Sequence, residues 1–172
     1  EDPAAVELQE RCAALFGHES ALYCPSGTMT NQIAINVHVR PGDEVVCDRK
    51  SHIYNYEGGG IARNSGASVR LIEGDNGRFR WSDVISEINP SDSHYARTSL
   101  VSVEDTCNRG GGSVWDLQDL RDIQTGCRGI NLPLHLDGAR VWNALIARNN
   151  NAVPPEDIWR SYGKTFDSIS VC

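Results

Sequence analysis

Several short stretches of the 172-residue sequence carry residue types that could do chemistry. The first, Ser26-Gly27-Thr28, combines two hydroxyl groups with a glycine at the predicted start of a helix. The first N–H groups of a helix lack partners and carry partial positive charge, and a glycine lets an anion approach this backbone. The tripeptide is therefore a candidate phosphate site. Helix capping by Ser26 or Thr28 explains the same residues, and the lysine of a Walker loop is missing.

A second stretch, "LPLHLDGARVWNA", places a carboxylate at the end of a very apolar strand. Asp137 closes this strand, and Arg140 follows three residues later. A buried carboxylate is destabilising unless a cation or a hydrogen-bond donor meets it. The sequence leaves two possible partners for the Asp137 carboxylate. Arg140 could form a structural ion pair with it, and the protonated ring nitrogen of a cofactor would serve equally well.

A third stretch, "SHIYNYEGGG", contains a histidine and a glutamate. We expect His52 and Glu57 to lie near the start of a helix, with side chains that point in different directions. An aromatic ring at this place could stack on a flat ligand, and a purely structural histidine is the plain alternative. In a fourth stretch, "EDTCNRGGG", polar side chains and a glycine triplet follow another predicted strand, which also suits an ordinary loop before a helix capped by Asp116.

Short β-type runs alternate with helical patterns along the chain, and this order predicts the elements that position these residues. We expect strands at 21–24, 44–47, 68–72, 99–103, 134–136 and 168–171. We expect helices at 3–16, 30–39, 53–62, 82–88, 116–126 and 139–147. Strand-then-helix repetition favours an α/β fold with a mostly parallel sheet and helices on both faces. Ligands of such sheets bind beyond the carboxyl ends of the strands.

The composition excludes several classes of partner. The chain has 16 basic and 23 acidic residues, a net charge of −7, and its basic residues do not cluster, which argues against nucleic acid. It lacks an apolar run of roughly 20 residues and a signal-peptide pattern, so we expect a cytoplasmic protein without membrane contact. The six cysteines have no CxxC spacing, and we expect them to be reduced, mostly buried and not part of a metal site.

Three of these stretches, "SGTMTNQIA", "SHIYNYEGGG" and "HLDGARVWNA", occur in an order and spacing that resemble the threonine aldolase family. Its members are pyridoxal-phosphate lyases of the aspartate-aminotransferase-like fold. The resemblance runs over essentially the whole chain. It implies that residues 1–172 are the large cofactor-binding domain of that fold, incomplete at both ends, in a homodimer or homotetramer that binds pyridoxal 5'-phosphate and a small amino acid.

The resemblance also implies roles for individual residues. Ser26, Gly27 and Thr28 would hold the cofactor phosphate. His52 would stack on the pyridine ring, and Asp137 would pair with the protonated pyridine nitrogen. Arg140 would contact the ring oxygen of the cofactor or the substrate carboxylate, for which a bidentate guanidinium is suited.

Two departures from the family pattern stand out. Where relatives commonly have Glu-Asn-Thr-His-Asn, this chain reads "EDTCN", so Cys107 replaces a histidine thought to touch the substrate hydroxyl, and a thiol is a poorer proton acceptor. The Schiff-base lysine of the family follows the strand expected at 168–171. Lys50 and Lys164 both precede that strand, so we expect this lysine beyond Cys172 and treat the sequence as an excerpt of a longer chain.

By resemblance, the reaction is the cleavage of threonine, allo-threonine or a related β-hydroxy-α-amino acid to glycine and an aldehyde. His52 is the candidate base, with Glu57 or a water as alternatives. A β-eliminating lyase or a racemase on the same scaffold is the nearest rival. A non-catalytic α/β module that keeps only the phosphate site is the rival from another class.

Overall fold

The computed structural model describes residues 2–172 and is built around one parallel five-stranded sheet. The strands lie in the order β2-β1-β3-β4-β5. Their bounds are Glu44–Asp48 for β1, Ser68–Ile72 for β2, Thr98–Glu104 for β3, Leu134–Gly138 for β4 and Ser168–Val171 for β5. Each of these strands matches a predicted one to within a few residues, because short apolar runs between turn residues suit the buried strands of parallel sheets.

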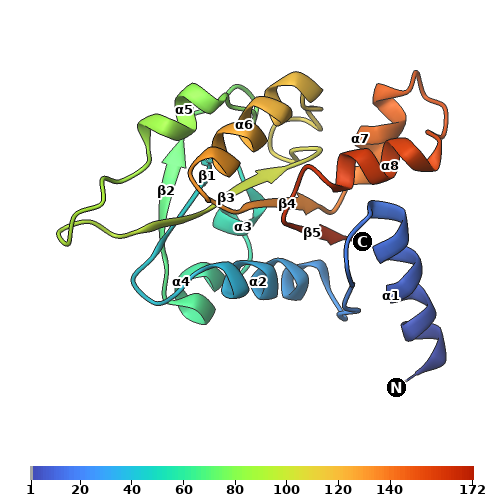
Figure 1. Ribbon diagram of the computed structural model, residues 1–172, viewed down its shortest axis with the longest axis horizontal. Coiled ribbons are helices and arrows are strands. Elements are labelled where there is room, and N and C mark those ends of the chain that lie inside the picture. The colour runs from blue at the N-terminus through green and yellow to red at the C-terminus, as the bar shows by residue number, and fades with distance from the viewer. Residues whose placement is uncertain (1) are drawn as a thin grey trace.

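Helices cover both faces of the sheet, which confirms the α/β prediction (Figure 1). One face carries α2 (Gly27–His38), α3 (His52–Asn55) and α4 (Gly60–Ser65). The other face carries α5 (Trp81–Ser86), α6 (Leu117–Gly129), α7 (Val141–Arg148) and α8 (Glu156–Gly163). The remaining helix, α1 (Pro3–Phe16), packs against α8, and Phe16 joins the core under α7 and α8.

Alternation along the strands divides the interior into two apolar cores. In β1, Val45 and Cys47 pack toward α2 and α4, whereas Val46 packs toward the opposite face. β4 alternates differently: Leu134 and Leu136 join the core under α6 and α7, while the residues between and after them are polar. The strand that carries Asp137 is therefore buried on both faces but apolar on only one.

Side-chain caps mark the starts of several helices, as predicted. Asp2 Oδ1 accepts a hydrogen bond from Ala4 N at 2.9 Å, and Asp116 Oδ1 accepts one from Gln118 N at 2.6 Å. Gly17 ends α1 with a φ of +71°, a conformation that favours glycine. Within residues 2–172, every helix falls short of the apolar length that a lipid bilayer demands.

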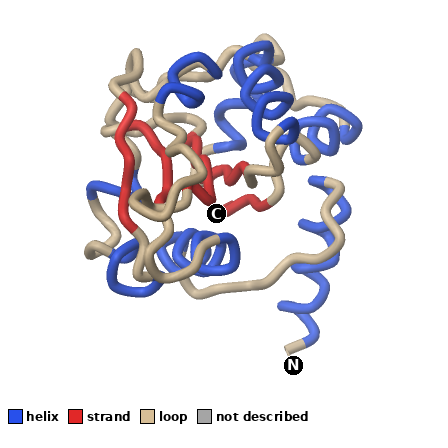
Figure 2. Tube along the Cα trace, turned by 60° about the vertical axis from the view of Figure 1, so that its left-hand side comes forward, coloured by secondary structure: helices blue, strands red, loops and turns tan. Residues whose placement is uncertain are grey.

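Residues 21–24 form a loop, so the strand predicted there is wrong (Figure 2). Leu22 and Tyr23 are 66% and 57% exposed, and their burial does not alternate as it would in a half-buried strand. The Tyr23 N–H donates to the side chain of Gln9 in α1, at 2.8 Å, instead of joining a sheet. The apolar residue types at 21–24 alone could not distinguish a strand from a loop.

The helix predicted at 53–62 is also wrong, because two short helices stand in its place. Gly58 and Gly59 have φ values of +64° and +67°, which a continuous right-handed helix does not allow. The helix is therefore interrupted between Asn55 and Gly60. In addition, α8 was not predicted, because only Trp159 and Tyr162 provide buried apolar side chains in a polar segment.

Candidate active site

The carboxyl ends of β3, β4 and β5 bring three polar residues side by side. Glu104 pairs in register with Asp137, and Asp137 pairs with Ser170. The start of α2 lies at the same edge, because the Thr30 hydroxyl is hydrogen bonded to the Ser170 hydroxyl. The edge predicted for a ligand is thus the place where the polar side chains gather.

Asp137 is a buried acid without a cationic partner in the part of the chain that the structure describes. It is 2% exposed, and burial raises the pKa of its carboxyl. Its hydrogen bonds come from neutral donors, Asn31 Nδ2 to Oδ2 at 3.0 Å and the Ala139 N–H to Oδ1 at 3.2 Å. Arg140 is exposed and forms no ion pair with Asp137 within residues 2–172, so the structural ion pair considered from the sequence is wrong.

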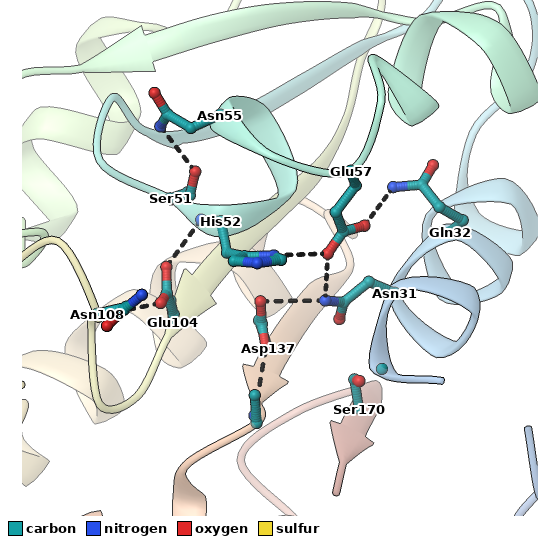
Figure 3. A network of polar contacts seen from close by, with 12 residues as sticks. Asn31, Gln32, Ser51, His52, Asn55, Glu57, Glu104, Asn108, Asp137 and Ser170 are labelled. Atoms are coloured by element: carbon teal, nitrogen blue, oxygen red, sulfur yellow. Dashed lines mark hydrogen bonds and ion pairs between the residues drawn. The ribbon is translucent and has the colours of Figure 1, made fainter. Parts of the chain in front are cut away.

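His52 and Glu57 point toward each other, so the prediction that they diverge is wrong (Figure 3). His52 Nδ1 lies 3.0 Å from Glu57 Oε1. A continuous helix would have separated the two side chains. The chain instead leaves α3 after Asn55, and the non-helical backbone of Tyr56 (φ −123°, ψ −48°) precedes Glu57, so the helical spacing no longer holds between the two residues.

Glu57 is the meeting point of the polar network in Figure 3. Its side chain is 0% exposed and receives Asn31 Nδ2 at 2.9 Å and Gln32 Nε2 at 2.6 Å in addition to the histidine. The two side-chain amides can only donate through these nitrogen atoms, so Glu57 acts as an acceptor, and a histidine that donates to it does so from Nδ1. The Nε2 atom of His52 takes no part in this contact and belongs to a side chain that is 36% exposed.

Glu104 holds the loops around this site in place. Its Oε2 accepts from the His52 N–H at 2.9 Å, and its Oε1 accepts from the Asn108 N–H at 2.9 Å. Burial raises the pKa of this carboxyl, while the two backbone donors act in the opposite direction. Glu104 therefore positions the backbone of the histidine rather than its ring.

The start of α2 fits both explanations of the Ser26-Gly27-Thr28 tripeptide. Ser26 Oγ accepts from Met29 N at 3.2 Å, so the predicted capping is confirmed. The N–H groups of Gly27 and Thr28 have no helical partner at this position. A Cβ atom on Gly27 would meet only Cys172 Sγ, at an ordinary 3.7 Å, so packing within this chain does not require a glycine here. An anion that approaches the backbone closely would require a residue without a side chain at this position.

Cys107, where the resemblance leads us to expect a histidine, is 1% exposed. Burial raises the pKa of its thiol to about 11, and the nearby Glu104 acts in the same direction. The thiol therefore stays protonated at neutral pH. All six cysteines are unpaired, but only Cys47, Cys107 and Cys127 are buried, so the expectation of mostly buried cysteines holds for half of them.

Sequence reasoning missed Asn31 and Gln32, which supply two of the donors to Glu57. The available signal was a pair of adjacent amide side chains, Asn31 and Gln32, near the start of a helix expected to pack on the sheet. One ligand atom each from His52, Glu57 and Asp137 lies within 4.8 Å of the others, a spacing that could hold a metal ion. The absence of a metal stays a prediction.

Comparison with known proteins shows the family to which the chain belongs. A model of the family described as "Beta-eliminating lyase" matches residues 1–172. The chain belongs to this family. Membership in the beta-eliminating lyase family, together with the relatives below, confirms the family predicted from the three sequence motifs.

The low specificity L-threonine aldolase of Saccharomyces cerevisiae is 39% identical over 176 residues, covering 100% of this chain and 43% of that protein. A solved structure of Leishmania major threonine aldolase is 29% identical with a TM-score of 0.69, covering 78% of this chain and 39% of that one. A solved structure from Listeria monocytogenes has a TM-score of 0.83 at 24% identity, covering 99% of this chain and 44% of that one. These likenesses confirm the aspartate-aminotransferase-like fold. The chain spans less than half the length of each relative.

Proposed function

We propose that this chain forms the cofactor-binding part of a pyridoxal-phosphate-dependent lyase. The proposed reaction cleaves the Cα–Cβ bond of a β-hydroxy-α-amino acid, most simply threonine or allo-threonine, to glycine and an aldehyde. The names of the relatives from Saccharomyces cerevisiae and Leishmania major support this substrate class. The observation that carries the proposal is Asp137, a buried carboxylate at the ligand edge that receives only neutral donors from residues 2–172.

The residues at this edge fit pyridoxal phosphate. The uncompensated carboxylate of Asp137 suits a protonated pyridine nitrogen, and the start of α2 at Ser26, Gly27 and Thr28 suits a phosphate group. The partly exposed ring of His52 suits stacking on a flat heterocycle. When bound, the cofactor would supply a ring that accepts the electron pair of the broken bond.

Asp137 is already oriented for this contact. Asn31 Nδ2 fixes one carboxylate oxygen and the Ala139 N–H fixes the other, so the carboxylate plane is set before a ligand arrives. A charge-assisted hydrogen bond from a ring nitrogen would then form without reorganisation. Asp137 would hold the proton at that nitrogen throughout the reaction.

His52 is the proposed base. Glu57 holds the Nδ1 proton, so the lone pair of Nε2 would accept the proton of the substrate hydroxyl. The carboxylate of Glu57 would stabilise the imidazolium that results, as acids beside catalytic histidines do. Cys107 would not share this task, because its buried thiol stays protonated.

Arg140 is proposed to bind the substrate carboxylate. It is exposed and has no ion-pair partner within residues 2–172. A guanidinium offers two parallel N–H groups to a carboxylate, which fixes both position and orientation.

Product analysis tests this reaction against its rivals. The full-length protein would be incubated with threonine, allo-threonine, serine and tyrosine in the presence of pyridoxal phosphate. Aldehyde and glycine from either threonine support the proposal. A β-eliminating lyase would instead release a keto acid and ammonia from serine or tyrosine, and a racemase would change only the configuration. No aldehyde from either threonine would overturn the proposal.

The visible absorbance of the bound cofactor distinguishes the proposed enzyme from a non-catalytic binding module. The full-length protein should show a visible cofactor absorbance band that borohydride abolishes, and a protein without such a band would fit the module.

We further propose a cytoplasmic homodimer or homotetramer that contacts neither nucleic acid nor membrane, as the resemblance and the net charge of −7 suggest. Sedimentation of the full-length protein would measure the assembly.

A further inference from the structure

A buried polar layer lies behind Asp137, between α2 and the last two strands. In β5, Ile169 and Val171 pack against the apolar core under α7, as Leu134 and Leu136 of β4 do. The alternate residues face α2, and they are the polar ones: His135, Asp137, Ser168 and Ser170. His135 is 0% exposed. Polar side chains buried in this way need hydrogen-bond partners, so the layer has a defined arrangement of donors and acceptors.

These residues are linked by a continuous series of hydrogen bonds, the hydrogen-bond chain, which ends at Asp137 and Glu57. It begins at half-buried His38, whose Nε2 lies 2.8 Å from Ser168 Oγ. Ser168 Oγ lies 2.9 Å from His135 Nδ1, and His135 Nε2 lies 3.2 Å from Asn31 Oδ1. Asn31 Nδ2 then reaches Asp137 and Glu57. The last part of this chain is visible in Figure 3.

The direction of the hydrogen bonds follows from Asn31. With its Nδ2 toward the acids, both contacts are satisfied and no carboxyl needs a proton. With the amide reversed, its oxygen would face two carboxyl oxygens at 2.9 and 3.0 Å, and both acids would need protons. The amide therefore donates to Asp137 and Glu57, and its oxygen faces His135.

The tautomer of His135 follows from the orientation of the Asn31 amide. Complete burial lowers the pKa of His135 to about 3, so the ring is neutral and carries a single proton. Asn31 Oδ1 can only accept, which places this proton on Nε2. Nδ1 must then accept, and the Ser168 hydroxyl is the donor within reach. The competing tautomer would donate from Nδ1 to the Ser168 carbonyl oxygen, 3.1 Å away, and would leave Asn31 Oδ1 without a donor.

We propose that His135 and Asn31 are positioning residues, in which the Nε2–H tautomer of His135 locks the Asn31 amide so that Asp137 and Glu57 remain hydrogen-bond acceptors. The proposal rests on the proposed function, because only a cofactor that presents a protonated nitrogen needs Asp137 in this state. Neither residue would touch the reacting atoms of the substrate.

The tautomer can be measured directly in the cofactor-free, full-length protein. Long-range ¹H–¹⁵N correlation spectra distinguish a neutral ring with Nε2–H from one with Nδ1–H and from a doubly protonated ring. The signals of His135 are assigned by their absence from the His135→Gln protein or, if that protein does not fold, by contacts with neighbouring strand protons. We expect neutral His135 with Nε2–H near pH 7. A proton on Nδ1, alone or in addition, would overturn the proposal.

Two substitutions then test the consequence for cofactor affinity. In His135→Gln, the side-chain amide nitrogen can reach the former position of Nε2 and still donate to Asn31. In the matched His135→Asn, the shorter side chain reaches only the position of Nδ1. Absorbance titration with pyridoxal phosphate should show His135→Gln within about threefold of wild type and His135→Asn weaker by about tenfold or more. Equal affinities of the two variants would contradict the proposal.

The readouts separate this inference from the proposed function. If the wild-type protein binds no pyridoxal phosphate, the proposed function fails, and the tautomer measurement still decides whether the hydrogen-bond chain runs as described. If the wild type binds the cofactor but the tautomer is reversed, the positioning role fails alone. Urea unfolding of both variants shows whether a loss of affinity merely follows a loss of stability.

Discussion

The amide nitrogen of Asn31 and the carboxylate of Asp137 lie 106 residues apart in the sequence and 3.0 Å apart, Nδ2 to Oδ2, in the fold. This contact satisfies a lone pair of a buried acid without neutralising its charge. Arg140, the nearest cation in the sequence motif, is exposed instead. We therefore propose that this site receives positive charge from a ligand.

Glu57→Gln should destabilise the protein. Glu57 accepts from three side chains, and a glutamine amide would turn a donor toward at least one of them. We expect the free energy of unfolding to fall by about 1–3 kcal/mol in urea titrations. Glu73→Gln is the control, because Glu73 pairs with Arg49 at the surface, where ion pairs contribute less than about 1 kcal/mol. Equal effects of the two changes would contradict the network.

His135 should make stability depend on pH. Its pKa is lowered to about 3 in the fold, against an ordinary value near 6.5, so the unfolded chain binds more protons between these values. Its contribution is complete above about pH 6.5 and is lost as the pH falls toward 3. We expect wild type to lose stability relative to His135→Gln on acidification from pH 7 to 5, by at most about 1.4 kcal/mol per pH unit. A constant difference in unfolding free energy would show that His135 titrates normally.

Two helical glycines should differ in how strongly alanine destabilises the protein. A Cβ atom on Gly163 would lie 2.1 Å from the backbone oxygen of Phe16, whereas one on Gly129 meets nothing within 4 Å. Gly163→Ala should therefore push α1 away from α8 and lower the free energy of unfolding by about 1–3 kcal/mol. Gly129→Ala should change it by less than about 1 kcal/mol. Thermal or urea unfolding measures both, and a neutral Gly163→Ala would disprove this close helix contact.

Cys107→Ser should leave aldehyde formation nearly unchanged. A thiol with a pKa of about 11 stays protonated at pH 7.5 and cannot serve as a proton acceptor. We expect the rate of aldehyde release from threonine to stay within about threefold of wild type if the proton acceptor is His52. A loss of more than about a hundredfold in a folded variant would instead assign the thiol a part in the chemistry.

Much of this fold could be predicted because its signals are local. Apolar runs such as Val45-Val46-Cys47 follow turn residues, and caps such as Asp116 are read from one side chain. Asp137 could be singled out for the same reason, since an acid at the end of an apolar strand is conspicuous without any knowledge of its neighbours.

The rest depends on contacts that sequence spacing does not contain. His52 and Glu57 meet because α3 ends at Asn55, before Glu57, whereas an uninterrupted helix would have placed the two side chains apart. Asn31 contacts strand residues more than 100 positions away, so its role appears only when α2 lies on the sheet. The apolar types at 21–24 suit a strand or a loop equally well, and only the position of α1 decides between them.

The protonation state of the bound pyridine nitrogen tests the central claim most directly. Pyridoxal phosphate labelled with ¹⁵N in its ring would be bound to the full-length protein and to Asp137→Asn, which has nearly the same shape without the charge. The account predicts a protonated ring nitrogen in the wild type near pH 7.5 and an unprotonated one in the variant, with about ten- to hundredfold weaker cofactor binding. A ring nitrogen that is unprotonated in the wild type, or equally protonated in both proteins, would contradict it.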